Sequence, residues 1–198
     1  LWDDAAVAVY SKPGSAFFWS SWGASTVESN NYRQAGIIDR SGHTLMLYDE
    51  GKASTDDMLT RYGAPLRALL DKSSRSHAAA GGIIATPDGL MIVAVEEIMP
   101  ISRNLEYLVP KAGAHWLVLG RPLSTGLAAD IGKRVNLSDF AVVDPEQAGP
   151  QWPRVKDPQG KDIAAISWTP TMPGERALRS NYSVIAGALL LALLLAFL

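Results

Sequence analysis

AAAGGIIATPDGLMIVAVEEI, residues 78–98, sets two apolar runs on either side of a turn. The runs Ala78–Ala85 and Leu90–Ile98 contain the isoleucine and valine residues that favour strands. Between them, Thr86-Pro87-Asp88-Gly89 holds a proline and a glycine that suit a tight turn. The stretch therefore predicts a β-hairpin in the middle of the chain.

Shorter elements surround this hairpin on both sides. The other expected strands are Gln34–Arg40, Thr44–Tyr48, Trp116–Gly120, Phe140–Val143 and Ile163–Trp168. Helices are expected at Leu1–Tyr10, from a capping box at Ser54 to about Leu70 with a kink or a restart at Pro65, and from Ser124 or Thr125 toward Lys133. This order is typical of an α+β fold around an antiparallel sheet. The segment between Tyr10 and Tyr32 is interpreted as a loop that covers one face of this sheet.

The composition limits the class of protein. The chain has 198 residues, of which 47% are apolar and 19% are charged, so it can pack the core of a single domain. Its formal net charge is −2, and this lack of basic surplus argues against a nucleic-acid partner. Cysteine is absent, which excludes disulfides, thiolate metal sites and a cysteine nucleophile.

Both ends of the chain suggest that it is cut from a longer one. It begins with Leu1 and shows neither an initiator methionine nor a signal peptide. Val184–Leu198 is apolar throughout, close to the roughly 20 residues that span a bilayer core. A buried core helix is the alternative, but such a helix is rarely apolar on every side. We therefore predict a truncated transmembrane helix at 183–198 after a linker at 175–182.

The orientation of that helix stays open. Arg176 and Arg179 precede it, and basic flanks favour the cytoplasmic side, which counts against an external domain. Large domains, however, cross the membrane largely regardless of charge.

Catalytic motifs are not found in the sequence. It has no phosphate-binding loop, dinucleotide glycine pattern, H-E-x-x-H pair or nucleophile elbow. His43, His77 and His115 stand in separate contexts, and we expect the first two to be solvated. Glu96 and Glu97 point to opposite faces of a strand, so at most one faces inward. We therefore expect no catalytic residue, metal or cofactor, and no enzyme activity in this chain.

Five short motifs resemble, in the same order, those of CHASE-type sensory domains of the fourth type. They are Trp2-Asp3-Asp4, Ala35–Gly42, Gly81–Ile84 with Leu90–Val95 and Ile98–Ile101, Trp116–Leu123, and Ile166–Pro170 with Pro173-Gly174. The resemblance covers most of residues 1–174. In the chain, Gly113-Ala114-His115 stands where a longer polar, glycine-rich stretch is common in the family.

The resemblance implies a PAS/Cache-like antiparallel sheet with a long N-terminal helix, truncated here, and a C-terminal transmembrane helix. Residues 1–174 would form a periplasmic sensory domain of a homodimeric receptor in the bacterial inner membrane. The cytoplasmic output would be a diguanylate cyclase or phosphodiesterase (GGDEF/EAL) or a histidine kinase, outside this chain. The sensed partner would be an unknown small molecule or a periplasmic protein.

Candidate ligand-binding residues combine aromatic walls with a few polar groups, as concave binding sites do. The proposed walls are Trp2, Trp19, Trp22 and Tyr48, and the polar groups are Asp3, Asp4 and Arg121. Structural roles are the alternative: Trp2 and Trp116 in the core, Asp4 on a solvated helix face, and Arg121 paired with a carboxylate.

Two functions of other classes stay open. The chain could be a membrane-anchored periplasmic module that binds another protein, or a tail-anchored hydrolase whose site carries no recognised motif.

Overall fold

The structure of this chain is a computed structural model that describes residues 2–11, 16–28 and 31–170. The strands are β1 (Gln34–Ile38), β2 (Thr44–Asp49), β3 (Lys52–Ala53), β4 (Ala80–Thr86), β5 (Gly89–Glu97), β6 (Trp116–Pro122), β7 (Ser138–Val143), β8 (Arg154–Lys156) and β9 (Asp162–Thr169). The α-helices are α1 (Trp2–Ala6), α2 (Ala16–Phe18), α3 (Ser25–Glu28), α4 (Met58–Ser76) and α5 (Thr125–Arg134). Two π-helical turns, η1 (Val7–Ser11) and η2 (Trp19–Gly23), and a 3₁₀ helix, η3 (Arg103–Leu108), complete the elements.

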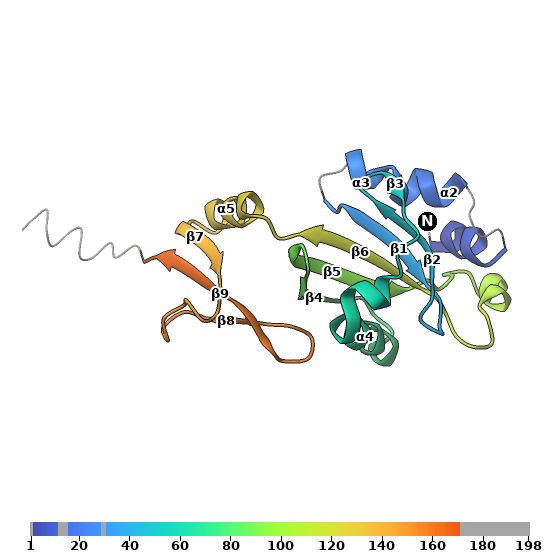
Figure 1. Cartoon of the computed structure of the whole chain (residues 1–198). Coiled ribbons are helices and arrows are strands. Elements are labelled where there is room, and N and C mark those ends of the chain that lie inside the picture. The colour runs from blue at the N-terminus through green and yellow to red at the C-terminus, as the bar shows by residue number, and fades with distance from the viewer. Residues whose placement is uncertain (1, 12–15, 29–30, 171–198) are drawn as a thin grey trace, which may run out of the picture.

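The described strands form two antiparallel sheets (Figure 1). The larger has six strands in the order β3-β2-β1-β6-β5-β4, and the smaller has three in the order β7-β9-β8. The predicted α+β class with an antiparallel sheet is thus confirmed. The smaller sheet was not foreseen as a separate one, because only two of its strands were recognised and strand β8 is just three residues long.

The central hairpin forms as predicted and organises the larger sheet. Strands β4 and β5 pair from Ala80 opposite Val95 to Thr86 opposite Gly89. Side chains alternate across a strand, so Val93 and Val95 face one side of the sheet and their neighbours face the other.

Helix α4 covers the side that Val93 and Val95 face. Its buried residues Tyr62, Leu66 and Leu69 pack in one core cluster with those valines. In strand β6, Trp116 and Val118 belong to the same cluster. Sequence alternation therefore sends every second residue of β5 and β6 under one helix.

The N-terminal helices cover the opposite side. Ala5 and Ala6 of α1, Phe18 of α2 and Trp22 of η2 join Leu117 of β6 in a second core cluster. Residues 2–11 are helical as expected, but the segment that follows is not the expected loop. Its described part forms α2, η2 and α3, because its aromatic residues recur at helical spacing and bury one face.

Helix α4 begins and bends at positions other than those predicted. Asp57, not Ser54, is the N-cap, and its Oδ1 accepts a 2.7 Å hydrogen bond from the backbone N–H of Thr60. The backbone leaves the helical region at Gly63 (φ 61°, ψ −146°), two residues before Pro65. Only glycine adopts this conformation without strain. The helix then continues to Ser76, beyond the predicted end.

The smaller sheet is reached from the end of β6 through α5. Ser124 caps α5 as predicted, and its Oγ accepts from the backbone N–H of Leu127 at 3.2 Å. The β8–β9 turn reaches back to the larger sheet, where a side chain on Gly82 would meet Pro158 at 3.1 Å. Glycine at this position lets the two sheets approach closely.

Residues 171–198 lie outside the described structure, and with them the linker at 175–182 and the transmembrane helix at 183–198. Of the helices in residues 2–11, 16–28 and 31–170, none combines the length and apolar character needed to cross a membrane. Both segment assignments therefore stay predictions.

Candidate functional site

Three of the proposed aromatic residues lie together on the β1–β2 side of the N-terminal helices. The rings of Trp19 and Tyr48 are 4.9 Å apart between centroids, and Phe18 lies 5.1 Å from Trp22 and 5.6 Å from Tyr48. Trp22 and Phe18 are buried, whereas Trp19 is 40% exposed. The rings fill the layer between helix and sheet, so their contacts with one another explain their placement. A contact with a ligand stays a prediction.

Trp2 and Asp3 lie at the other end of this helical layer. Trp2 packs against the second core cluster and lines a cavity of about 350 Å³ beside Glu97. The Asp3 carboxylate accepts from the backbone N–H of Ile101 at 2.7 Å and from that of Ser102 at 2.9 Å. Hydrogen bonds from Ser102 lower the pKa of Asp3 below its ordinary value. Asp3 thus ties α1 to the segment after β5.

Arg121 stands apart from these residues. It lies near the end of β6, opposite Ile92, on the side of the sheet that carries Leu117 and Leu119. No hydrogen bond or ion pair of Arg121 occurs within residues 2–11, 16–28 and 31–170. Asp4 is exposed on α1. The structure therefore does not gather the seven proposed residues into one pocket.

A polar cluster that sequence reasoning missed lies under the C-terminal half of α4. The Glu97 Oε1 accepts from Arg40 Nη1 at 2.9 Å and from Ser74 Oγ at 2.7 Å. The exposed ring of His77 lies 3.4 Å from the second Glu97 oxygen. The Arg40 guanidinium carbon lies 4.7 Å from the centre of the Trp116 ring, a cation–π distance. Four segments far apart in the sequence meet at this point.

The chemistry of this cluster is that of a fixed ion pair. The Glu97 side chain is only 10% exposed. Burial by itself would raise the pKa of Glu97, but hydrogen bonds from Ser74, Arg40 and His77 lower it below its ordinary value. The sequence did contain one signal for this position of Glu97. Side chains alternate along a strand, so Glu97 shares the α4 side of β5 with Val93 and Val95.

A cavity of about 400 Å³ adjoins the cluster, between the β1–β2 turn and α4. Arg40 and Ser74 line this cavity, as do two further arginines of the helix, Arg67 and Arg75. Its volume lies within the range of small-molecule sites. Because the charged groups line an open space, the arrangement can bind a small polar molecule.

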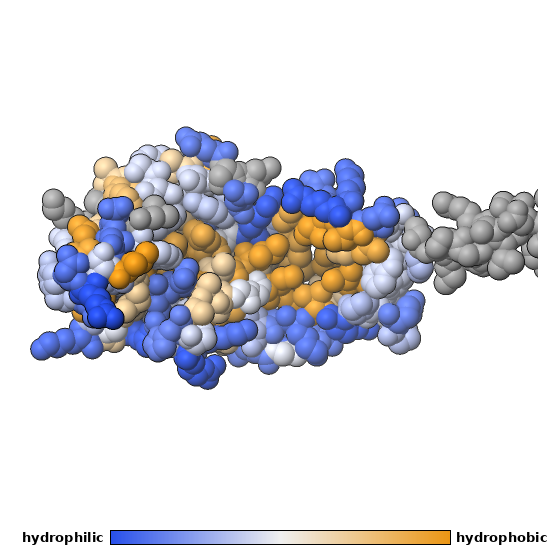
Figure 2. All heavy atoms as spheres, turned by 180° about the vertical axis from the view of Figure 1, so that it is seen from behind, coloured by the Kyte–Doolittle hydropathy of each residue, from blue (hydrophilic) through white to orange (hydrophobic). Residues whose placement is uncertain are grey.

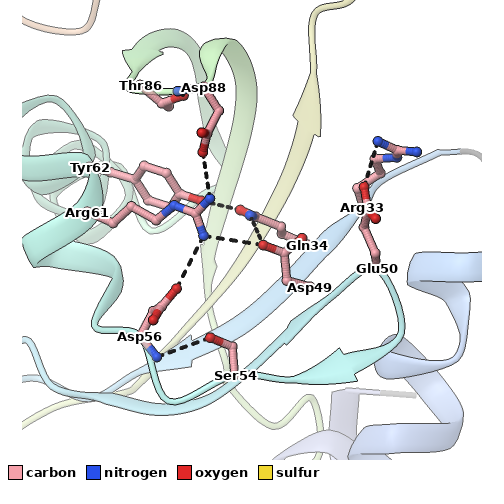
Figure 3. A network of polar contacts seen from close by, with 10 residues as sticks. All are labelled: Arg33, Gln34, Asp49, Glu50, Ser54, Asp56, Arg61, Tyr62, Thr86 and Asp88. Atoms are coloured by element: carbon pink, nitrogen blue, oxygen red, sulfur yellow. Dashed lines mark hydrogen bonds and ion pairs between the residues drawn. The ribbon is translucent and has the colours of Figure 1, made fainter.

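A second polar cluster is centred on Arg61 (Figure 3). Its guanidinium pairs with Asp49, Asp56 and Asp88 at 3.3, 3.4 and 2.8 Å. The buried Gln34 donates to Asp49 at 2.7 Å and accepts from the Tyr62 hydroxyl. Every group drawn in Figure 3 already has a protein partner. Through the contacts of Arg61 the cluster joins β2, α4 and the β4–β5 turn.

The described part of the chain has no cluster of side chains that could bind a metal ion. Across residues 2–11, 16–28 and 31–170, no three histidine or acidic side chains lie close enough together to hold a metal ion. His43 and His77 are exposed, as predicted, with side-chain exposures of 80% and 84%.

Comparison with known proteins adds a family match. The family model described as the CHASE4 domain matches residues 1–142, which include the whole larger sheet. No curated protein matches the chain. Two solved structures of the periplasmic domain of LuxQ from Vibrio cholerae are similar, one of them in selenomethionine form. The selenomethionine structure is 12% identical over 85% of this chain and 88% of its own, with a TM-score of 0.41. The second is 11% identical over 86% and 94%, with a TM-score of 0.35.

Proposed function

The chain belongs to the CHASE4 domain family of extracellular sensory domains, and from this membership we propose that it detects a small molecule for a membrane-bound receptor. The observation that carries the proposal is the Arg40–Glu97 cluster beside an open cavity. A ligand that changes the contacts of this cluster would favour one packing of the domain over another.

A short physical route leads from this cluster to α1. Glu97 is the last residue of β5, and two side chains, those of Asp3 and Tyr10, tie the segment that follows to α1 and η1. The Asp3 carboxylate accepts from Ile101 and Ser102, and the Tyr10 hydroxyl donates to the Ile98 carbonyl at 2.8 Å. Burial raises the pKa of Tyr10 to about 12, so its hydroxyl keeps its proton. A shift at Glu97 is thereby coupled to the N-terminal helix.

In this proposal the helix carries the change toward the membrane. The domain, a homodimer with a PAS/Cache-like sheet, lies in the periplasm, anchored in the bacterial inner membrane. The output is a cytoplasmic diguanylate cyclase or phosphodiesterase (GGDEF/EAL) or a histidine kinase in the same receptor. The chain itself binds and does not catalyse.

An alternative partner, a periplasmic protein, is favoured by the molecular surface. Figure 2 shows apolar side chains gathered in a hollow in the half of the molecule that holds the smaller sheet. Hollowed apolar surfaces of this kind mark protein contacts as well as ligand grooves. Under this alternative the chain is a membrane-anchored interaction module.

The decisive experiment uses the full-length receptor. Its output, measured as cyclic-di-GMP level or phosphotransfer, is compared between wild type and a receptor that lacks residues 2–170. Asp3→Asn, which weakens the link to Ser102, should uncouple the output from added ligand while the domain stays folded. Asp130→Asn is the matched control, because among the described residues that carboxylate pairs only with Lys133, in an exposed i,i+3 contact. An output that is the same with and without the domain would overturn the proposal.

A further inference from the structure

The cavity between the β1–β2 turn and α4 has an unusual wall. Arg40 comes from the turn, and Arg67 and Arg75 come from one face of α4, because residues eight apart in a helix share a side. Ser41 and Ser74 add hydroxyl groups to the same wall. Three guanidinium groups therefore border a space of about 400 Å³.

The charges of this wall are only partly balanced by the protein. Arg40 is paired with Glu97 at 2.9 Å. Arg67 and Arg75 form no ion pair or hydrogen bond within the described ranges of the chain. Asp71, between them on α4, is the one carboxylate that lines the cavity among the described residues. The lining keeps a net positive charge and two guanidinium groups with unused donors.

The floor of the cavity supplies an independent observation. Trp116, which is 6% exposed, lines it, and the ring carries Arg40 on its face. The indole Nε1–H is buried and has no acceptor among the described residues. Native structures pair such buried donors in nearly every case, so this donor points to an acceptor that the chain itself does not provide.

We propose that this cavity binds a small organic anion, with its carboxylate or phosphate group on Arg67 and Arg75, a second acceptor atom on the Trp116 Nε1–H and its apolar body against Leu70. Guanidinium forks match the geometry of carboxylate and phosphate oxygens. Cations and neutral sugars lack the negative charge that the arginines of this wall attract. The inference deepens the proposed sensory role and rests on it for its biological meaning.

Arg40 links the site to the sensory route. It lines the cavity and also holds Glu97 and Ser74. An anion that attracts the Arg40 guanidinium competes with Glu97, the residue that ends β5. The bound anion would thus act on the contact from which the route to α1 begins.

The test is a thermal-shift titration of the full chain in detergent, with succinate and inorganic phosphate as anionic probes. Putrescine and glucose serve as cationic and neutral controls, and sodium chloride matches the ionic strength. A probe at 100 times its dissociation constant should raise the melting temperature by about 5–10 °C. Stabilisation by succinate alone identifies a carboxylate ligand, and stabilisation by phosphate alone identifies a phosphate ligand.

Variants locate the site. Arg67→Ala and Arg75→Ala together should weaken binding of the effective probe by at least about 10-fold. Lys72→Ala removes the same charge from α4 without lining the cavity and should bind as the wild type does. All three side chains are exposed, so the variants should fold. No stabilisation by either anion, or an equal loss in Lys72→Ala, would overturn the inference.

Binding and signalling fail separately. Anion binding by the chain in a receptor whose output ignores the domain would sustain this inference and overturn the sensory proposal. A receptor whose output depends on a ligand but whose domain binds neither anion would sustain the sensory proposal and overturn this inference.

Discussion

Arg61 joins three segments through one guanidinium group, and Arg61→Met removes all three connections at once (Figure 3). Its nitrogens lie 3.3 Å from Asp49 of β2, 3.4 Å from Asp56 before α4 and 2.8 Å from Asp88 of the β4–β5 turn. Methionine keeps an unbranched apolar stem and a similar helix propensity. The variant therefore tests the contribution of the charge and its hydrogen bonds.

The exposure of each partner sets the expected size of the effect. The side chains of Asp56 and Asp88 are 59% and 71% exposed, so each of these pairs contributes about 0.2–1 kcal/mol. Asp49 is 30% exposed, and a charge-assisted hydrogen bond to such a group contributes about 1.5–3 kcal/mol. The three contacts share one group and do not add fully, so the expected loss is about 2–4 kcal/mol. In a domain of this size the melting temperature should fall by roughly 5–15 °C.

The assay is thermal unfolding of the full chain followed by circular dichroism. Arg33→Met is the matched control, because Arg33 and its partner Glu50 are 57% and 59% exposed, and that pair should contribute at most about 1 kcal/mol. Equal small losses in the two variants would refute the reasoning that half-buried, shared contacts decide the stability of this region.

Three further comparisons test the start of α4, the Glu97 carboxylate and the contacts of α5. Asp57→Ala should lower the free energy of unfolding by about 1 kcal/mol through loss of the N-cap, and Ser54→Ala by less than about 0.5 kcal/mol, as measured in urea; equal losses would contradict this assignment. The stabilisation that Glu97 provides is complete at a pH above the ordinary glutamate pKa of 4.5. It is lost as the pH falls through the lowered pKa of Glu97 in the folded state. Glu97→Gln should therefore flatten the acid-range dependence of unfolding, and an unchanged slope would be evidence against a contribution of the Arg40–Glu97 pair to stability. Gly132→Ala should cost about 1–3 kcal/mol, because its Cβ would lie 2.4 Å from a side chain of β7. Gly126→Ala, with its nearest atom at 3.9 Å, should instead stabilise α5 by up to about 1 kcal/mol in thermal melts, so the same sign for both would speak against this packing.

Local chemistry predicted those elements whose signals lie within a few residues. The β4–β5 hairpin follows from two strand-forming runs around Pro87 and Gly89, and Ser124 caps α5 as its position before the helix indicates. The same reasoning misplaced the start of α4, because Ser54 and Asp57 are both good caps and the choice between them depends on the contact of Asp57 with Thr44 of β2. It also took the aromatic segment before Tyr32 for a loop, since its apolar spacing indicates a helix only when a sheet is present to bury it.

The residues that build the candidate site could not be grouped from the sequence. Arg40 and Glu97 are 57 positions apart, and Ser74 lies 34 positions from Arg40. Their meeting depends on the order of strands in the sheet, which places β1 beside β6 and β6 beside β5. Of the residues proposed from the sequence, Trp2 reaches a cavity, Trp19 packs against Tyr48, and Arg121 stands apart. Trp22 joins Tyr48 through the ring of Phe18 between them.

The sequence by itself determined the α+β class, the central hairpin, the family and the alternation that turns Val93 and Val95 inward. The fold class, the hairpin and the alternation follow from hydrophobic periodicity and turn chemistry, which act over a few residues. The family was indicated instead by the resemblance of five short motifs in order. Only the tertiary structure decided that Glu97 meets Arg40 under α4 and that Trp116 and three arginines border one cavity. Such contacts arise from strand register and helix packing, which join segments distant in the chain and leave no local pattern at any single residue.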